Sequence, residues 1–188
     1  MLNIRAWWAV LGVWLPISVA ASEANYQLAV NVTQKDKTFL TEVSFRIPLN
    51  GCQSWEFLTD YASAKQLPGI IESSFTRISE NKVRVHRVFE DRVWWMPLRI
   101  ESVVEYSEIP NEGHDFVQIE GDFKSYRGSW RLTPEADTTV FRYASVSEPD
   151  SSIPKPIIRY VMQERMHRSF LAMAQYGASR QSMTCRNK

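Results

Sequence analysis

Two charged residues lie within segments whose residue pattern is otherwise typical of β-strands. Arg142 alternates with Val140 and Ala144, and Glu120 follows Ile119. If both charged side chains point inward, an arginine–carboxylate pair can bind the head group of a ligand or transfer a proton. A solvated strand face or a structural ion pair is the alternative, and the sequence leaves both interpretations open.

The three histidines form no recognisable catalytic pattern. His86 falls on the strand face opposite Val83 and Val85. His114 is expected in a turn, and His167 on a helix beside two arginines. No Ser-His-Asp or Cys-His arrangement is evident, although such triads form in space and residue order does not exclude them. We therefore assign no catalytic residue.

The segment GDFKSYRGSW, residues 121–130, combines glycines, cations and aromatic side chains. It does not fit a phosphate-binding loop, because the glycine spacing differs and a strand is expected where a helix is required. We predict two antiparallel strands joined at the letters KSYR. Gly121 and Gly128 would relieve crowding where the sheet bends.

The charge balance excludes two classes of partner. The chain has 22 Lys and Arg residues against 21 Asp and Glu residues. A net charge near zero, without a basic run, argues against nucleic-acid binding. It also argues against a polybasic module that binds membrane surfaces.

Cys52 and Cys185 are the two cysteines of the chain. In an oxidising compartment they are expected to form a disulfide, with two free thiols as the alternative. The loop closed by this bond would span most of the chain, which corresponds to about 4–5 kcal/mol of stabilisation in the chain-entropy account. No Cys or His spacing typical of zinc is present, so we expect neither a metal nor another cofactor.

The N-terminal residues have the order of a secretory signal. Arg5 is followed by an apolar run over residues 6–19 and then by small residues. The run is shorter than the roughly 20 residues that span a bilayer. We predict a signal peptide over residues 1–21, cleaved after Ala21 or a neighbouring alanine, and export to a bacterial periplasm or the medium. An uncleaved N-terminal anchor is the alternative.

The elements that must position any site are mainly strands. Residues 22–37 form a polar extension in which NYQLAVNV has the composition of a short strand. The alternation in KTFLTEVSFRIPL predicts a half-buried strand, and residues 50–69 change to a helical spacing that predicts one or two short helices. Runs of β-branched and aromatic residues then continue to residue 149. Short polar turns separate them, which predicts antiparallel hairpins and six or seven strands in total.

The last segment is expected to be a long amphipathic helix. Apolar or small residues recur there at intervals of four and three, which is typical of one helix face. They are Ile158, Met162, Met166, Phe170, Met173 and Gly177. Residues 179–188 are expected to form a C-terminal tail.

Four segments in this order resemble the START-like superfamily, which includes polyketide cyclase/dehydrase proteins, lipid-transfer domains and coenzyme Q-binding proteins. They are WEFLTDYASAKQLPGIIES at 55–73, EGDFKSYRGSWRLTP at 120–134, TTVFRY at 138–143 and IPKPIIRYVM at 153–162. The resemblance covers residues 38–178 and implies an α+β helix-grip fold. In that fold a curved antiparallel sheet wraps around the C-terminal helix.

The resemblance also implies a cavity between the sheet and the helix that accepts a hydrophobic small molecule. We predict that the wall of this cavity is formed by inward apolar and aromatic residues, by the methionines of the helix and by Arg142, if it points inward. These ligand-binding candidates are Phe45, Trp95, Phe123, Trp130, Arg142, Met162, Met166, Phe170 and Met173. Of the adjacent Trp94 and Trp95, one is expected inside and one outward in a hairpin loop at the cavity mouth, where it can touch a membrane. Ordinary core packing is the alternative for each of these residues.

The sequence thus predicts an exported protein that carries or sequesters a hydrophobic small molecule, either a lipid or an isoprenoid quinone. One alternative is a cyclase, dehydratase or hydrolase that uses the same cavity. Another is a protein-interaction module. The ligand's identity and the oligomeric state do not follow from the sequence.

Overall fold

The computed structural model of the protein describes residues 26–93, 95–149 and 155–185. Within them, eight strands form one antiparallel sheet in the order β1-β2-β8-β7-β6-β5-β4-β3. The strands are β1 (Ala29–Lys35), β2 (Thr38–Ile47), β3 (Ile70–Ser79), β4 (Lys82–Val93), β5 (Met96–Ile109), β6 (Gly113–Gly121), β7 (Phe123–Glu135) and β8 (Thr138–Pro149). The helix-grip fold is confirmed, with more strands than the six or seven predicted. The short strand expected near residue 30 is β1, which extends the sheet at the edge beside β2.

The helices lie where the change in periodicity predicted them. The α-helix α2 (Gly51–Thr59) and the 3-10 helix η1 (Tyr61–Gln66) connect β2 to β3. After β8, α3 (Lys155–Tyr160), the π-helical segment η2 (Val161–Arg165) and α4 (Met166–Ala178) follow one another directly. We call these three elements together the last helix.

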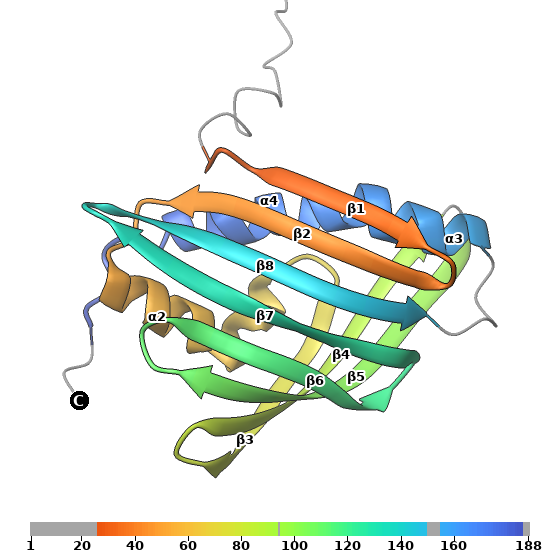
Figure 1. Ribbon diagram of the computed structural model, residues 1–188, viewed down its shortest axis with the longest axis horizontal. Coiled ribbons are helices and arrows are strands. Elements are labelled where there is room, and N and C mark those ends of the chain that lie inside the picture. Colours follow the sequence, from red (N-terminus) through yellow and green to blue (C-terminus); the bar gives the residue numbers. More distant parts are fainter. Residues whose placement is uncertain (1–25, 94, 150–154, 186–188) are drawn as a thin grey trace, which may run out of the picture.

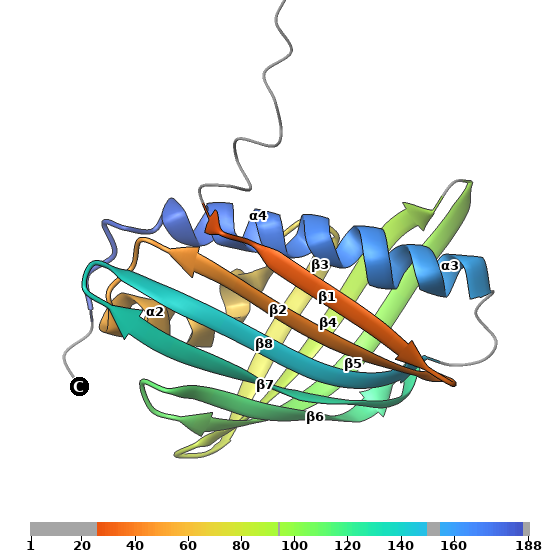
Figure 2. The same cartoon turned by 45° about the horizontal axis from the view of Figure 1, so that its top comes forward.

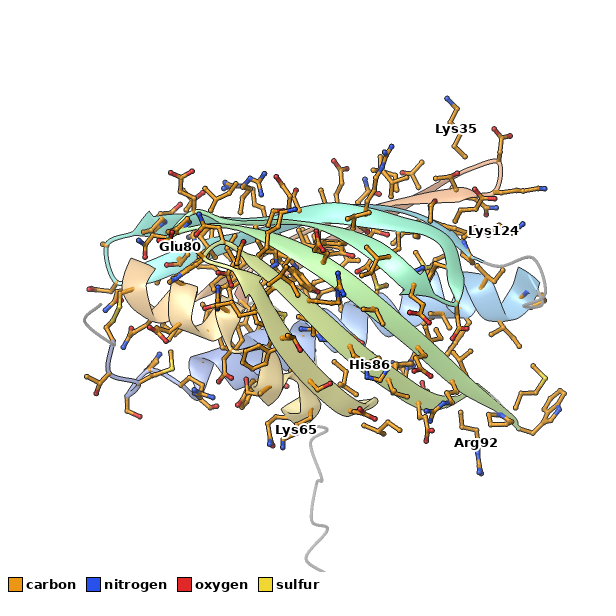
Figure 3. All side chains as sticks on the ribbon, turned by 90° about the horizontal axis from the view of Figure 1, so that it is seen from below. Lys35, Lys65, Glu80, His86, Arg92 and Lys124 are labelled. Carbon is orange, nitrogen blue, oxygen red and sulfur yellow. A yellow bond between two sulfur atoms is a disulfide. The ribbon has the colours of Figure 1, made fainter. Side chains whose placement is uncertain are left out.

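The sheet curves around the last helix, which lies across its concave face (Figures 1 and 2). We call the end of the molecule that holds α2 the α2 end, and the opposite end the α3 end. The β4–β5 hairpin projects at the α3 end, where Figure 3 labels Arg92. Residues 1–25, which include the predicted signal peptide, lie outside the described residues, as does Trp94.

Alternation along β2 and β8 builds the centre of the core. On β2 the residues Val43, Phe45 and Ile47 are buried, and on β8 Phe141 and Tyr143 are buried. The register places Phe45 opposite Phe141, and their rings stack with centroids 5.3 Å apart. The concave face is therefore aromatic where α4 packs on it.

The α2 end is fastened covalently. Cys52 and Cys185 form the predicted disulfide, with their Cα atoms 6.0 Å apart. In the same place, Gln53 Nε2 donates hydrogen bonds to the carbonyl oxygens of Gln181 (2.8 Å) and Met183 (3.1 Å). These contacts fix α2 to the segment that follows α4.

The π-helical segment changes which residues of the last helix are buried. Ile157 and Met162 are both buried although they are five positions apart. The predicted Ile158 is only partly buried. A π turn has i→i+5 periodicity, so the regular spacing of three and four fails at this point.

The predicted turn at KSYR is wrong. Those four residues lie inside β7, and β6 ends at Gly121, so Asp122 is the residue between the strands. Gly121 has φ 138°, and a Cβ there would lie 2.4 Å from the carbonyl oxygen of Glu101. Glycine permits both this backbone conformation and the close approach of β5.

The described residues contain no helix that is long and apolar enough to cross a membrane. They also contain no group of His, Cys, Asp or Glu side chains arranged to hold a metal ion.

Candidate functional site

A cavity of about 90 Å³ lies between the sheet and α4 at the α2 end of the molecule. Its apolar wall comes from α2, η1 and the residue after it, β7 and α4. The residues of this wall are Phe57, Leu58, Ala64, Leu67, Trp130 and Met173. Its polar side is formed mainly by Tyr61, Arg87, Tyr106 and His114. The gap expected between sheet and helix is therefore present, and polar groups converge on it.

His114 is the most unusual group in the cavity. It is the second residue of β6, only 2% exposed, and neither ring nitrogen has a hydrogen-bond partner among the described residues. Burial lowers its pKa to about 3, and the charges of Arg87 and Arg131 act in the same direction. The imidazole is therefore neutral near pH 7, with one nitrogen able to accept a proton or hydrogen bond and the other able to donate.

Gly113 makes room for this histidine. Its φ is 141°, and a Cβ would lie 2.1 Å from the carbonyl oxygen of Trp130 on β7. Glycine therefore allows β6 and β7 to approach closely just before His114. The ring of His114 then contacts the Tyr106 ring edge-on, with centroids 4.6 Å apart.

Arg87 brings a positive charge to the same cavity. Its guanidinium donates from Nη1 to the hydroxyl of Tyr106 (3.3 Å) and from Nε to Ser73 Oγ (3.4 Å). The guanidinium carbon also lies 5.9 Å from the centre of the Tyr106 ring. No carboxylate of the described residues forms an ion pair with Arg87, so an oxygen of a bound molecule can take that place.

The carboxylate of Glu108 is already engaged. The Tyr61 hydroxyl donates to its Oε1 (3.0 Å), and Arg77 Nη1 pairs with its Oε2 (2.9 Å). Burial and this carboxylate raise the pKa of Tyr61, so Tyr61 remains a protonated donor. Of Tyr61, Glu108 and His114, it is therefore the His114 ring that keeps an unpaired nitrogen within the described part of the chain.

The predicted ligand-binding residues fall into six places. Trp130 and Met173 line the cavity. Phe45 and Phe170 lie next to it in the aromatic core, while Met162 and Met166 lie further along the last helix. Phe123, at the start of β7, is half-buried against Tyr126, and Trp95 is 79% exposed in the turn between β4 and β5. Arg142 is exposed on the opposite face of the sheet.

Three expectations about orientation are wrong. Arg142 points away from the core and donates to Thr133 Oγ1 (2.6 Å), because its neighbours Phe141 and Tyr143 occupy the buried face. Trp95, which was expected in the cavity wall, is exposed because it lies in the turn between β4 and β5. Glu120, whose orientation the sequence left open, is exposed as well. His114 lies inside a strand rather than a turn, because β6 begins directly after the turn at Asn111 and Glu112.

Sequence reasoning missed Arg87, although a signal was present. Arg87 continues the alternation of Val83 and Val85, both of which are buried. An arginine in phase with buried valines indicates an inward charge. His114 is likewise in phase with Phe116 on β6. Tyr61 and Tyr106 gave no comparable signal, because tyrosines are frequent in ordinary cores.

Comparison with known proteins agrees with this fold. The sequence profile of the family described as polyketide cyclase / dehydrase and lipid transport matches residues 47–173. No curated protein sequence matches the chain significantly.

Solved structures of similar fold come from several bacteria. The Zhui aromatase/cyclase from Streptomyces sp. R1128 superposes with a TM-score of 0.65 at 13% identity, covering 78% of this chain and 97% of that one. A STAR-related lipid transfer protein fragment from Xanthomonas axonopodis gives 0.59 at 12% identity, covering 80% and 98%. A protein from Thermus thermophilus gives 0.64 at 17% identity, covering 75% and 95%. At these identities the similarity concerns the fold.

Proposed function

The chain belongs to the polyketide cyclase / dehydrase and lipid transport family, and from this premise we propose that it binds an amphipathic small molecule, such as a lipid or an isoprenoid quinone, between the sheet and the last helix. The observation that carries the proposal is the cavity in which Arg87 and His114 lie beside aromatic and aliphatic walls. Burial of the ligand's apolar surface would supply the affinity, and the two polar groups would set its orientation.

The polar groups favour a ligand whose head group carries a carbonyl or a similar oxygen. The Arg87 guanidinium can donate to such an oxygen, and the neutral His114 ring can donate or accept a second hydrogen bond. His114 is buried without a partner among the described residues, which is unfavourable for a polar group, and Arg87 is partly buried. A matching oxygen would therefore bind more tightly here than a purely apolar group.

The cavity holds the head group and not a whole lipid. Its volume of about 90 Å³ is well below the roughly 300–1,000 Å³ of pockets for drug-sized ligands. The tail must therefore separate part of the last helix from the sheet. We expect this separation at the α3 end, because the α2 end is held by the disulfide.

A second candidate function is acid–base catalysis on the bound molecule, as in a cyclase, dehydratase or hydrolase. The observation that favours it is the buried, neutral His114, which has an unused nitrogen next to a cation. With a pKa of about 3 the ring is a weak base, so in this role it would orient and polarise the substrate by hydrogen bonds while Arg87 stabilises a developing oxyanion.

Export is part of the proposal. The charged, apolar and small-residue order of residues 1–21 supports it. The Cys52–Cys185 bond supports it as well, because structural disulfides persist mainly in oxidising compartments.

Native mass spectrometry of protein purified from its own host, followed by extraction of any bound molecule, tests the proposal. The Arg87→Met variant should bind the identified molecule about 10–100-fold more weakly, because a hydrogen bond to a charged group is lost. The matched control Arg142→Met, on the outer face, should bind as the wild type does. Protein that is repeatedly ligand-free and binds neither phospholipid nor quinone in titrations would contradict the proposal.

A further inference from the structure

A row of buried hydroxyl groups crosses three adjacent strands at the α3 end of the concave face. We call Thr41 of β2, Ser145 and Ser147 of β8 and Tyr126 of β7 the hydroxyl row. The register pairs Thr41 with Ser145, and Ser147 with Tyr126. Thr41 is 0% exposed, Ser145 3% and Ser147 2%. Polar side chains have thus replaced apolar ones on a face that is otherwise the core.

Two of these hydroxyls have no partner among the described residues. Thr41 Oγ1 and Ser147 Oγ are buried without a hydrogen bond, whereas the Tyr126 hydroxyl lies 2.9 Å from that of Tyr143. The buried Thr139, at the other end of β8, donates to the carbonyl oxygen of Leu49 (2.8 Å). Buried polar groups are normally paired, so the two unpaired hydroxyls indicate a partner that the chain itself does not supply.

The hydroxyl row lies beneath the first half of the last helix. Phe170 of α4 contacts the rings of Phe45 and Tyr143, with centroids 6.2 and 5.1 Å away. Met162 lies eight residues earlier, about 12 Å along a helix. Both views show the helix running from the α3 end, where β2 begins and β8 ends, towards the α2 end (Figures 1 and 2). Met162 therefore lies near the level of Thr41.

A groove beside the helix gives access to this region. It has a volume of about 670 Å³ and runs between β1 and the last helix. Val32 of β1 is paired with Thr41, and Glu164, His167 and Leu171 form part of the helix side of the groove. The groove therefore passes next to the strand position of Thr41.

We propose that the hydroxyl row is a second polar subsite, which binds a neutral oxygen function of the ligand, either a hydroxyl, a carbonyl or an ester, and that the ligand reaches it through the groove between β1 and the last helix. This inference rests on the proposed function. The row contains only uncharged donors and acceptors, so it suits a neutral group rather than a carboxylate or phosphate.

The register gives the spacing of the two polar subsites. Trp130, which is paired with His114, lies four residues from Tyr126 on β7, or about 13 Å along a strand. The ligand class is thus an elongated apolar molecule with oxygen functions at least about 13 Å apart, because His114 and Ser147 also lie on different strands. Phe170 packs on Trp130 and Tyr143, at the level of His114, and must turn aside when the ligand occupies both subsites.

A matched pair of probes tests this inference. Decanediol with a hydroxyl at each end has roughly the required length, and decanol lacks the second hydroxyl. The measurement is the ratio of the two dissociation constants, by titration calorimetry, for wild type and for the double variant Thr41→Val with Ser147→Ala. In the wild type, decanediol should bind more tightly than decanol. We expect this difference in affinity to become about tenfold smaller in the double variant, which corresponds to the loss of one or two hydrogen bonds. Thr41→Ser, which keeps the hydroxyl, and Thr139→Val, which removes a paired one, should keep the ratio.

The outcomes separate this inference from the proposed function. An unchanged ratio in a double variant that still binds both probes would overturn the subsite and leave the proposed function standing. A double variant in which only the melting temperature changes would overturn the subsite as well, because the hydroxyls would then be structural. If the wild type binds neither these probes nor phospholipid nor quinone, the proposed function fails and the subsite with it.

Discussion

The two ends of the last helix are held by different forces. At the α2 end, the Cys52–Cys185 bond and the hydrogen bonds of Gln53 fix the chain around α4. Gly177 packs so closely that a Cβ would lie 2.6 Å from Ile47 Cδ1. At the α3 end, where Ile157 and Met162 are buried, Arg165 of η2 forms an ion pair with Asp91 of β4, and both side chains are less than 20% exposed.

This difference suggests how a closed fold can admit a ligand. The disulfide at the α2 end keeps the head-group cavity and His114 in place. The ion-paired end also contains a π-helical segment and two buried hydroxyls without partners among the described residues, which make its packing less favourable. We therefore expect opening to begin at the α3 end. Four predictions test the comparison, from the largest expected effect to the smallest.

Removal of the disulfide should have the largest effect. Cys52→Ala with Cys185→Ala should lower the free energy of unfolding by about 3–5 kcal/mol, because the bond closes a loop that spans most of the chain. Urea denaturation measures this loss, and the exposed Ser182→Ala serves as control. A loss below about 1 kcal/mol would mean that the two ends are not held differently.

The burial of neutral His114 at the α2 end should make the free energy of unfolding depend on pH. Its pKa is about 3 in the folded protein and near 6.5 when unfolded, so the unfolded state binds the extra proton between these values. The contribution of neutral His114 to the free energy of unfolding is fully present above pH 6.5 and is lost as the pH falls. The loss is about 1.4 kcal/mol per unit, or about 2 kcal/mol between pH 6.5 and 5. His114→Phe should flatten this slope in denaturation curves.

His86 provides the matched control for that experiment. It lies on the outer face, and its hydrogen bond to Glu101, together with Glu72, raises its pKa. Its contribution is complete below the unfolded pKa of about 6.5 and is lost as pH rises through the folded value, so His86→Gln should leave the slope below pH 6.5 unchanged and alter it, with the opposite sign, only above that pH. Equal slopes in wild type and His114→Phe would show that His114 is not buried as a neutral ring.

Loss of the ion pair should affect the α3 end only. Arg165→Met leaves Asp91 partly buried without its cation and should lower the free energy of unfolding by about 1–2 kcal/mol. Hydrogen exchange should become faster in α3 and η2 and stay unchanged in the second half of α4. A second substitution, Asp91→Leu, should restore most of the stability, since it removes the unpaired charge. Uniformly faster exchange along the helix would contradict an opening confined to one end.

The smallest effect on stability is expected for Trp95 at the tip of the β4–β5 hairpin. Because its side chain is 79% exposed, Trp95→Ser should change the free energy of unfolding by less than about 0.5 kcal/mol. Trp suits the membrane interface, so the variant should bind phosphatidylcholine vesicles more weakly in sedimentation assays. Leu40→Ser, at an exposed apolar site on β2, is the control. Equal vesicle binding by both variants would contradict membrane contact by this hairpin.

Much of this fold was predictable because the local patterns agree with the final structure. Period-two alternation gave β2, and the change of period gave α2, η1 and the last helix. The π-helical segment was not predictable, because its residues suit an ordinary α-helix. Its effect appears only in the burial of Ile157 in place of Ile158.

The candidate site was predicted less well than the fold. Trp130 and Met173 were identified as large apolar residues on the inward face, while Arg142 was assigned to the wrong face. Alternation alone could have placed Arg87 inward. It could not have shown that Arg87 and His114 both reach Tyr106 and line one cavity, because β4 and β6 are separated by β5.

The sequence by itself determined the strands, the helices and the two cysteines available to pair, because these depend on neighbouring residues and on composition. The tertiary structure decided which polar groups are enclosed. Burial depends on the twist of the sheet and on what covers each face, so His114 is neutral inside while His86 is charged more readily outside. The same covering by the last helix leaves Thr41 and Ser147 without partners among the described residues, which no local pattern of residues encodes.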